Sequence, residues 1–448
     1  MSADPDLSAP DALAGELETG VARSPGLVVR VARRLVLQRL ASLAEGELEL
    51  IDPGAGEGQE QRLRFGARTS ACPLHATLRV QDPHFYAAVA LGGALGAAEA
   101  YVEGLWHSDD LVAVVRVMAR NRQVLGDLER GLARLVVPLR KLAHALRRNS
   151  RAGSRRNIAA HYDLGNDFYR QFLDPTMMYS CALFDGLDED APGALQAASL
   201  AKLDLVCRKL ELKPGDEVVE IGTGWGGFAL HAARGYGCRV TTTTISRQQF
   251  KYAREQVHRL GLEDRVEVLL EDYRDLTGPR FQGRFDKLVS LEMIEAVGYR
   301  YLDGYFATCS GLLKPQGMGL IQAITLADQE FERYRRNVDF IQRYIFPGAQ
   351  LLSLSAITRC LARSTDLTLF HLHDITPHYA STLRLWRRSF LEHAAEIRAL
   401  GFSESFLRLW EYYFCYCEGG FEERVIGDVQ LLLTKPLCRR APVPVAAA

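Results

Sequence analysis

The sequence predicts a doubly wound α/β domain, preceded by a smaller α+β domain. Seven short β-rich segments alternate with helical segments over the second half of the chain. A glycine-dense turn follows the first of them, and three further short strands with helices stand near the N-terminus. Such alternation indicates a parallel sheet whose ligand lies beyond the carboxyl ends of its strands. The seven candidate strands are 217–221, 239–244, 265–270, 287–291, 318–325, 368–372 and 429–434.

Composition is that of a globular cytoplasmic protein. The length of 448 residues allows two or three domains, and 48% hydrophobic residues are enough for substantial cores. A net charge of −1 gives no overall argument for binding nucleic acid. The nine cysteines are scattered without a CxxC pair, so we expect reduced thiols and no metal site. The first ten residues lack a basic segment, so we expect no signal peptide.

The N-terminal region begins with residues 1–24, whose Asp, Ala, Gly and Ser content predicts a disordered tail. Residues 25–44 carry apolar side chains at helical spacing, including Val28, Val31 and Leu35, with arginines around them. A basic amphipathic helix can lie on an anionic membrane. It can equally be a helix with one solvated face.

Residues 25–125 are predicted to form an accessory, lipid-binding domain. Short strands are expected at 47–51, 61–65 and 76–80, and helices over 82–122. The apolar run 85–101 is interrupted by Glu99 and is shorter than the ~20 residues of a membrane span. We therefore expect it to be a buried core helix.

Residues 126–157 are predicted to be a basic linker. Eight Lys and Arg residues fall between 132 and 157, and no acidic residue interrupts them. A basic segment of this kind gains about 1 kcal/mol per residue near anionic lipid, but it can also be a solvated connection. Because no aromatic side chains for base stacking are interspersed, nucleic acid is the least favoured partner.

The glycine-dense turn reads Glu220-Ile221-Gly222-Thr223-Gly224-Trp225-Gly226. Glycine is needed where a turn requires positive φ or where backbone approaches a ligand closely. The acidic residue stands before the first glycine, where it suits the ammonium of S-adenosylmethionine (SAM). The alternative is a tight strand-to-helix turn without a ligand.

The next two strands end in polar residues. After the second, Thr244 and Gln249 can hydrogen-bond ribose hydroxyls, although threonine runs are also ordinary strand formers. After the third, Asp272 can accept from an adenine amino group while Tyr273 packs beside the ring.

The fourth strand ends in two carboxylates, Glu292 and Glu295. If a helix begins here, the two share a face, and Glu295 is the favoured catalytic group. The alternative is charge complementing the helix dipole. Upstream, Tyr162, Tyr179 and Ser180 are candidates to line the pocket, because aromatic faces attract a sulfonium. Cys181 has no histidine partner in the sequence and is more simply a packing residue.

An apolar insertion at 326–353 follows the fifth strand. At the ligand end of such a sheet it can cover a lipid chain, or it can be ordinary core.

Taken together, these stretches resemble the family of cyclopropane-fatty-acyl-phospholipid synthases and mycolic acid cyclopropane synthases, which depend on SAM. The resemblance covers residues 157–435, and the N-terminal stretch 99–106 resembles the accessory domain of the longer bacterial members. The motifs that carry it are His161-Tyr162-Asp163-Leu164-Gly165-Asn166, Tyr179-Ser180-Cys181, the glycine turn, Thr244-Ile245-Ser246, Glu292-Met293-Ile294-Glu295-Ala296-Val297-Gly298, Tyr344-Ile345-Phe346-Pro347-Gly348 and His378-Tyr379-Ala380-Ser381-Thr382-Leu383 with Trp386.

The resemblance implies a Rossmann-like SAM-dependent methyltransferase domain over 158–440. Its reaction is transfer of a one-carbon unit from SAM to a cis double bond of an unsaturated phospholipid acyl chain. A carbocation forms, and a bound bicarbonate removes a proton so that a cyclopropane closes. Aromatic walls that include Trp386 are expected to stabilise the cation. The implied anion-holding, catalytic positions are Cys181, Glu295, Gln322, Ile324 and Tyr379. The implied SAM-binding positions are Tyr162, Tyr179, Ser180, Glu220, Gly222, Gly224, Trp225, Gly226, Thr244, Gln249, Asp272 and Tyr273.

One departure affects the expected product. The family's usual His-Thr-Ile is Gln322-Ala323-Ile324 here, and glutamine cannot titrate near neutral pH. Cyclopropane formation is the first hypothesis, and methylene- or methyl-branched chains are the alternative. A methyltransferase of a soluble small molecule and a catalytically silent lipid-binding protein are further alternatives. We expect a cytoplasmic protein at the inner face of an anionic membrane, with a homodimer as one open option.

Overall fold

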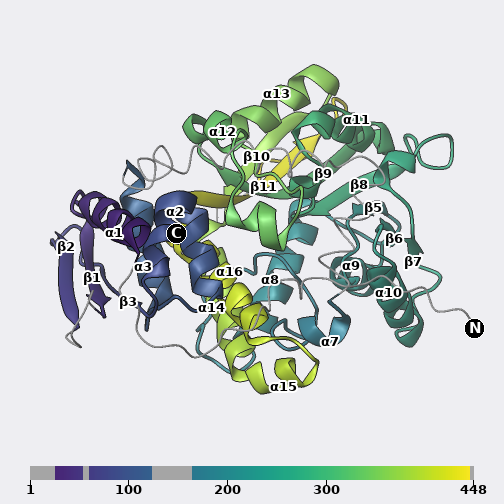
Figure 1. Ribbon diagram of the computed structural model, residues 1–448. Coiled ribbons are helices and arrows are strands. Elements are labelled where there is room, and N and C mark those ends of the chain that lie inside the picture. The colour runs from purple at the N-terminus through teal and green to yellow at the C-terminus, as the bar shows by residue number, and fades with distance from the viewer. Residues whose placement is uncertain (1–25, 54–59, 124–163, 444–448) are drawn as a thin grey trace, which may run out of the picture.

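The computed structural model describes residues 26–53, 60–123 and 164–443. The predicted tail at 1–24, the basic linker at 126–157 and Tyr162 therefore lie outside the described residues. Figure 1 shows two bodies, an N-terminal one with a small sheet and a larger one built on a second sheet.

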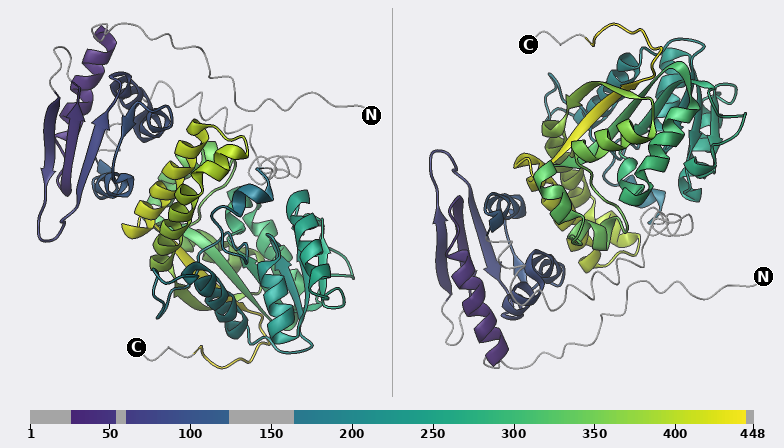
Figure 2. Two further views of the ribbon diagram at one scale, coloured as in Figure 1. Left: turned by 90° about the horizontal axis from the view of Figure 1, so that it is seen from below. Right: turned by 90° about the horizontal axis from the view of Figure 1, so that it is seen from above.

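The N-terminal body is an α+β domain, as its short strands followed by helices predicted. Its sheet has the order β2-β1-β3-β4, in which β1 pairs antiparallel with β2 and parallel with β3. Figure 2 shows α2 and α3 between this sheet and the larger body. The elements are α1 (Leu27–Leu40), β1 (Gly46–Asp52), β2 (Gln61–Ala67), β3 (His75–Val80), α2 (His84–Val102), β4 (Trp106–His107) and α3 (Leu111–Arg120).

The apolar helix α2 is the core helix that the sequence predicted. By length and composition it is the one helix among the described residues that is able to cross a membrane, but most of it is buried inside the protein. Its backbone is broken at Gly93, where φ is +60°, so it is not one straight span. Tyr86 and Tyr101 anchor its two halves in the core.

The larger body contains a seven-stranded sheet in the order β10-β11-β9-β8-β5-β6-β7. The pairs from β9 to β7 are parallel, while β11 runs antiparallel to both β9 and β10. This arrangement confirms the predicted doubly wound α/β domain. The strands are β5 (Glu217–Ile221), β6 (Arg239–Thr243), β7 (Val266–Leu269), β8 (Phe285–Leu291), β9 (Leu313–Leu326), β10 (Thr368–Asp374) and β11 (Ile426–Thr434).

Helices cover this sheet, and α14 and α16 lie on the side of the larger body that faces the N-terminal domain (Figures 1 and 2). The α-helices are α7 (Asn166–Tyr169), α8 (Ala194–Lys209), α9 (Gly227–Tyr236), α10 (Arg247–Arg259), α11 (Leu302–Leu312), α12 (Asp328–Tyr334), α13 (Leu354–Ser364), α14 (Thr376–Glu392), α15 (Ala394–Ala399) and α16 (Glu404–Glu422). The shorter turns are η2 (Tyr273–Asp275), η3 (Ile294–Ala296), η4 (Tyr299–Tyr301) and the π-helix η5 (Ile341–Ile345).

One apolar cluster joins the two bodies. Helix α16 packs against α14 on one side and against α2 and α3 on the other. The Tyr101 and Tyr412 rings lie 5.6 Å apart across the junction, and Glu423 accepts from Arg116 Nε at 2.7 Å and from Arg120 Nε at 2.6 Å. The hydrophobic core is therefore continuous between the two domains.

The insertion at 326–353 contributes to the same cluster. Phe340 and Ile345 are buried in it, while the Tyr344 hydroxyl donates to Glu99 of α2 at 2.7 Å. These contacts support the ordinary-core alternative for this segment. Its covering of a lipid chain stays a prediction.

Candidate functional site

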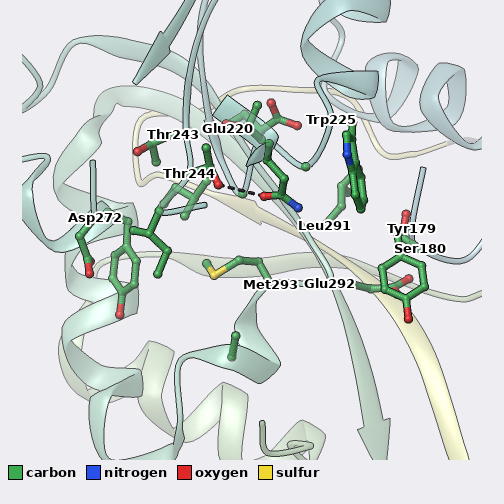
Figure 3. A pocket seen from close by; sticks show the side chains of 18 of the residues that line it. Tyr179, Ser180, Glu220, Trp225, Thr243, Thr244, Asp272, Leu291, Glu292 and Met293 are labelled. Atoms are coloured by element: carbon green, nitrogen blue, oxygen red, sulfur yellow. Dashed lines mark hydrogen bonds between the residues drawn. The ribbon is translucent and has the colours of Figure 1, made fainter. Parts of the chain in front are cut away.

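A pocket opens at the carboxyl ends of β5, β6, β7 and β8 (Figure 3). Its walls come from the turn after each strand and from residues 177–180 of the upstream segment. At one end of it lies Asp272, and at the other lie Tyr179, Ser180 and Glu292. The topology thus brings together most of the residues that the sequence singled out. Those lining the pocket are Tyr179, Ser180, Glu220, Gly222, Gly224, Trp225, Thr244, Gln249, Asp272 and Tyr273.

The glycine turn has the backbone that the sequence requires. Gly222, Gly224 and Gly226 have φ values of +102°, +53° and +92°, which L side chains rarely adopt. A Cβ at Gly222 would also lie 3.1 Å from the Met293 side chain. The turn is therefore closely packed beneath the pocket, and α9 begins directly after it.

Glu220 is a buried carboxylate at the end of β5. Its Oε2 accepts from Thr242 Oγ1 at 2.6 Å, and Thr242 is itself within 2.7 Å of the Thr223 hydroxyl. Burial raises the pKa of Glu220 to about 8. A cationic group in the pocket would restore its charge.

The far end of the pocket carries the other polar candidates. Thr244 Oγ1 donates to Gln249 Oε1 at 2.9 Å, so both side chains are held at the wall. The Asp272 carboxylate accepts from the backbone N, Nε and Nη2 of Arg274, at 3.0, 2.8 and 2.6 Å. Arg274, which the sequence argument did not consider, thus fixes Asp272, and Tyr273 lies beside it.

Aromatic rings surround the other end. The Tyr179 hydroxyl is 3.0 Å from the Tyr413 hydroxyl, and its ring is 5.2 Å from Trp386. Trp225 Nε1 donates to Asn166 Oδ1 at 2.7 Å. Trp386 itself is fully buried and is not part of the pocket lining. Trp386 thus packs against Tyr179 without reaching this pocket, and its role in stabilising a cation stays a prediction.

Glu292 is held in an unusual backbone conformation, with φ at +48°. This residue therefore does not begin a helix, and the expectation that it shares a helix face with Glu295 is wrong. Its Oε1 accepts from Cys181 N at 2.8 Å and from Gln322 Nε2 at 2.6 Å, while Oε2 accepts from the Tyr379 hydroxyl at 2.5 Å. Three donors from three distant segments thus converge on one carboxylate.

Glu295 lies beside this carboxylate, outside the pocket lining. Its Oε1 accepts from Ile324 N at 2.6 Å, and its buried Oε2 has no hydrogen-bond partner. Burial and the nearby charge of Glu292 raise the pKa of Glu295 to about 8. Glu295 is therefore largely neutral at pH 7.

The residues assigned to bicarbonate come together, but they do not fit a bound anion. Cys181 N, Gln322 Nε2 and the Tyr379 hydroxyl all donate to Glu292, and Ile324 N donates to Glu295. Each assigned donor is thus already satisfied by a carboxylate of the chain. A second anion here would also lie against buried acidic groups.

The Cys181 thiol is not a nucleophile in this setting. The side chain is fully buried, and its Sγ lies 3.2 Å from the Ala182 carbonyl oxygen. Burial and the charges of Asp428 and Glu292 raise the pKa of the thiol well above its usual range. Its contribution to the site is the backbone N–H that binds Glu292.

Two charged residues of the site were not predicted from the sequence. Lys202 of α8 is fully buried, and its Nζ donates to Ser180 Oγ at 2.7 Å. Asp428 of β11 is also fully buried, and its Oδ2 accepts from Gln322 Nε2 at 3.0 Å. The one available signal for Lys202 was its place within an apolar helical stripe that includes Ala198 and Val206.

Lys202 is the cation that offsets several buried acids. Its charge acts to lower the pKa values of Glu220, Glu292 and Asp428, against the larger effect of burial. A second buried lysine on the same helix, Lys209, instead donates to Gln430 Oε1 at 2.7 Å. Gln430 Nε2 in turn donates to Gln322 Oε1 at 3.0 Å, which turns the Gln322 amide group toward the two acids.

The sheet order and the pocket define a Rossmann-like methyltransferase fold. The solved cyclopropane synthase MmaA2 of Mycobacterium tuberculosis matches with a TM-score of 0.56 and 32% identity, covering 63% of this chain and 98% of that one. The mycolic acid cyclopropane synthase CmaA1, complexed with SAH and CTAB, matches with a TM-score of 0.57 and 31% identity over 63% of this chain and 98% of that one.

Residues 149–431 match the mycolic acid cyclopropane synthetase family. The tuberculostearic acid methyltransferase UfaA1 of Mycobacterium tuberculosis is 39% identical over 77% of this chain and 79% of its own length. The cyclopropane-fatty-acyl-phospholipid synthase of Escherichia coli is 37% identical over 80% of this chain and 86% of its own length. The chain belongs to the mycolic acid cyclopropane synthetase family and is a SAM-dependent enzyme.

Proposed function

We propose that this enzyme transfers the methyl carbon of SAM to the cis double bond of an unsaturated phospholipid acyl chain. One observation carries the proposal. The pocket that contains the glycine turn and Glu220 also contains Glu292, a carboxylate held by three donors beside aromatic rings. Cofactor-binding features and a candidate proton acceptor therefore share one cavity. The product is a cyclopropane or a branched chain.

The pocket residues fit SAM. Glu220 is placed to pair with the ammonium group, and Ser180, which receives a hydrogen bond from Lys202, is placed to donate to the carboxylate. Thr244 and Gln249 offer groups for the ribose, and Asp272 and Tyr273 border the adenine end. When bound, SAM supplies an electrophilic methyl group, and its transfer to the alkene leaves a cation on the acyl chain.

The chain's own residues make this chemistry feasible because they orient the two reactants and exclude water from the cation. Holding two reactants in line can contribute about 7–11 kcal/mol to lowering a barrier. The ring of Tyr179, backed by Trp386, offers a π face that stabilises positive charge without reacting with it. Tyr379, whose hydroxyl donates to Glu292, is buried and helps to keep water from the cation.

Membrane contact is proposed to involve helix α1. The helix has two apolar faces, and the buried one includes Val36 and Leu40. The other face is exposed and is named here the α1 apolar stripe. It consists of Leu27, Val28, Val31 and Leu35, which are 70%, 69%, 49% and 39% exposed.

The α1 apolar stripe is flanked by the exposed arginines Arg30 and Arg34. An exposed apolar stripe with cations at its sides fits the interface of an anionic bilayer. This supports a peripheral position at the inner face of the cytoplasmic membrane. A contribution from residues 126–157 and a homodimer stay predictions.

The reaction is tested by mass spectrometry of lipids from a host with unsaturated membranes that expresses this protein. A gain of CH2 per acyl chain is expected for a ring or methylene product, and a gain of CH4 for a methylene product that a hydride donor of the host has reduced to a saturated methyl branch. Unaltered lipids, together with purified protein that binds SAM, would refute acyl-chain modification.

The membrane contact is tested by co-sedimentation with anionic vesicles. The double variant Val28→Asp/Val31→Asp should lose binding. The control is Leu391→Asp/Leu400→Asp, which alters two other exposed leucines, 43% and 44% exposed, on α14 and directly after α15. Equal binding by both variants would remove α1 from the proposal.

A further inference from the structure

The anion position of the site is filled by the protein itself. We propose that the Glu292 carboxylate is the base that takes the proton from the substrate cation, in the place of a bound bicarbonate. This inference rests on the proposed function and assigns a catalytic residue that the sequence argument passed over in favour of Glu295.

The first support is the convergence of donors. Cys181 N, Gln322 Nε2 and the Tyr379 hydroxyl come from three separate parts of the chain and reach Glu292 at 2.8, 2.6 and 2.5 Å. Such a set of short bonds fixes the carboxylate and acts to lower its pKa, against the larger effect of burial, which raises it. It leaves no donor among these groups for an external anion.

The second support is the backbone of Glu292. A φ of +48° is rarely adopted by residues other than glycine, asparagine and aspartate. Residues held in such conformations cost on the order of 1–3 kcal/mol and gather at functional sites. At Glu292 this conformation directs the side chain into the cluster of donors.

The third support is access. Glu292 lines the pocket with Tyr179 and Ser180, whereas Glu295 does not line it. In Figure 3, Glu292 lies at the same end of the pocket as those two residues. Of the two carboxylates, Glu292 is therefore the one that faces the space available to a substrate.

The cluster is already rich in buried acids. Burial raises the pKa of both Glu292 and Asp428, and the charges of Glu292 and Glu295 raise that of Asp428 further. Lys202 acts to lower the pKa of Glu292. A bicarbonate would add a further negative charge to this buried acidic cluster.

The proposed step is complete without an added reactant. A C–H bond of the cationic acyl chain breaks, and its electron pair forms either the third C–C bond of a ring or a C=C bond. The proton passes to an oxygen of Glu292, which becomes a neutral acid. The cation is discharged, and no oxidant or reductant is consumed.

The test compares three forms of the full-length protein on phospholipid vesicles with SAM, in CO2-free buffer and in buffer with added bicarbonate. Wild type is expected to turn over equally in both. Glu292→Gln keeps the shape but removes the base, so its kcat should fall about 10²–10⁴-fold in both buffers. Glu292→Gly suits the positive φ and opens the anion position, so bicarbonate should restore part of its activity.

Glu292→Gln is thus the matched control for rescue, because it leaves no room for bicarbonate. Calorimetric SAM binding and thermal unfolding verify that both variants are folded. Wild-type turnover that depends on bicarbonate, or near-normal turnover by Glu292→Gln, would overturn the proposal. Equal rescue of both variants would overturn it too. Wild type that alters no lipid in either buffer would instead refute the proposed function, and this inference with it.

Discussion

Replacing Lys202 with methionine tests how the buried charges of the site are balanced. Lys202 is fully buried, and its Nζ lies 2.7 Å from Ser180 Oγ, with Glu220 and Glu292 within electrostatic reach. Removing one partner of a buried ionic cluster typically costs about 3–5 kcal/mol, because the remaining charges are left uncompensated. Methionine preserves most of the side-chain volume, so the loss in the free energy of unfolding measures the effect of removing the charge.

Lys209→Met is the matched control on the same helix. Lys209 is 5% exposed, and its Nζ contacts Gln430 and His373 rather than a carboxylate. Burial lowers the pKa of both lysines, that of Lys209 from 10.5 to about 7, but only at Lys202 do nearby carboxylates, among them Glu292 and Asp428, act against the shift. A lysine whose pKa is lowered by folding destabilises the folded state at every pH below its unfolded pKa. Its replacement should therefore be neutral or stabilising at pH 7.

The assay is urea denaturation at pH 7 followed by tryptophan fluorescence, with the slopes of the transitions compared. Lys202→Met should unfold at clearly lower urea than wild type, and Lys209→Met should not. The deficit of Lys202→Met should grow as the pH rises above about 8, because Glu220 then loses its proton and adds a further uncompensated charge. Equal stability of the two variants would refute the charge-balance argument.

Two further predictions concern the cofactor end of the pocket. SAM binding at pH 7 should release nearly one proton, because an ammonium partner returns Glu220 from a pKa of about 8 to its ionised form; calorimetry in two buffers of different ionisation enthalpy measures this, and identical heats would contradict it. Gly222→Ala should destabilise the protein and weaken SAM binding, since φ is +102° and Met293 is close. Gly235→Ala, in open space on α9, should instead stabilise it by ~0.5–1 kcal/mol, as thermal unfolding can show.

The sequence predicted the sheet and the glycine turn because both are local signals. Strands β5 and β6 are rich in β-branched residues, and the positive φ values of the turn leave glycine as the natural choice. The cofactor candidates followed because consecutive parallel strands bring their carboxyl ends to one edge.

The catalytic cluster could not be predicted in the same way, because it depends on distant contacts. Gln322 meets Asp428 and Gln430 across 106 and 108 residues, since β11 returns beside β9. The spacing of Glu292 and Glu295 suggested a helix, and no sequence pattern marks a glutamate with positive φ. The apolar helical stripe around Lys202 was a signal of its burial, but no sequence pattern showed which distant acids lie near it.

The aromatic junction between the domains limits how this enzyme can be shortened. MmaA2 is matched over 98% of its length by 63% of this chain. About a third of this chain therefore has no counterpart in MmaA2. In this protein Tyr412 of α16 packs against Tyr101, and Glu423, which follows α16, accepts hydrogen bonds from two arginines of α3. A fragment that begins after α3 would expose the apolar face of α16 and leave Glu423 without its arginine partners. Shortening this protein to the length of its smaller relatives therefore also requires polar substitutions on α16.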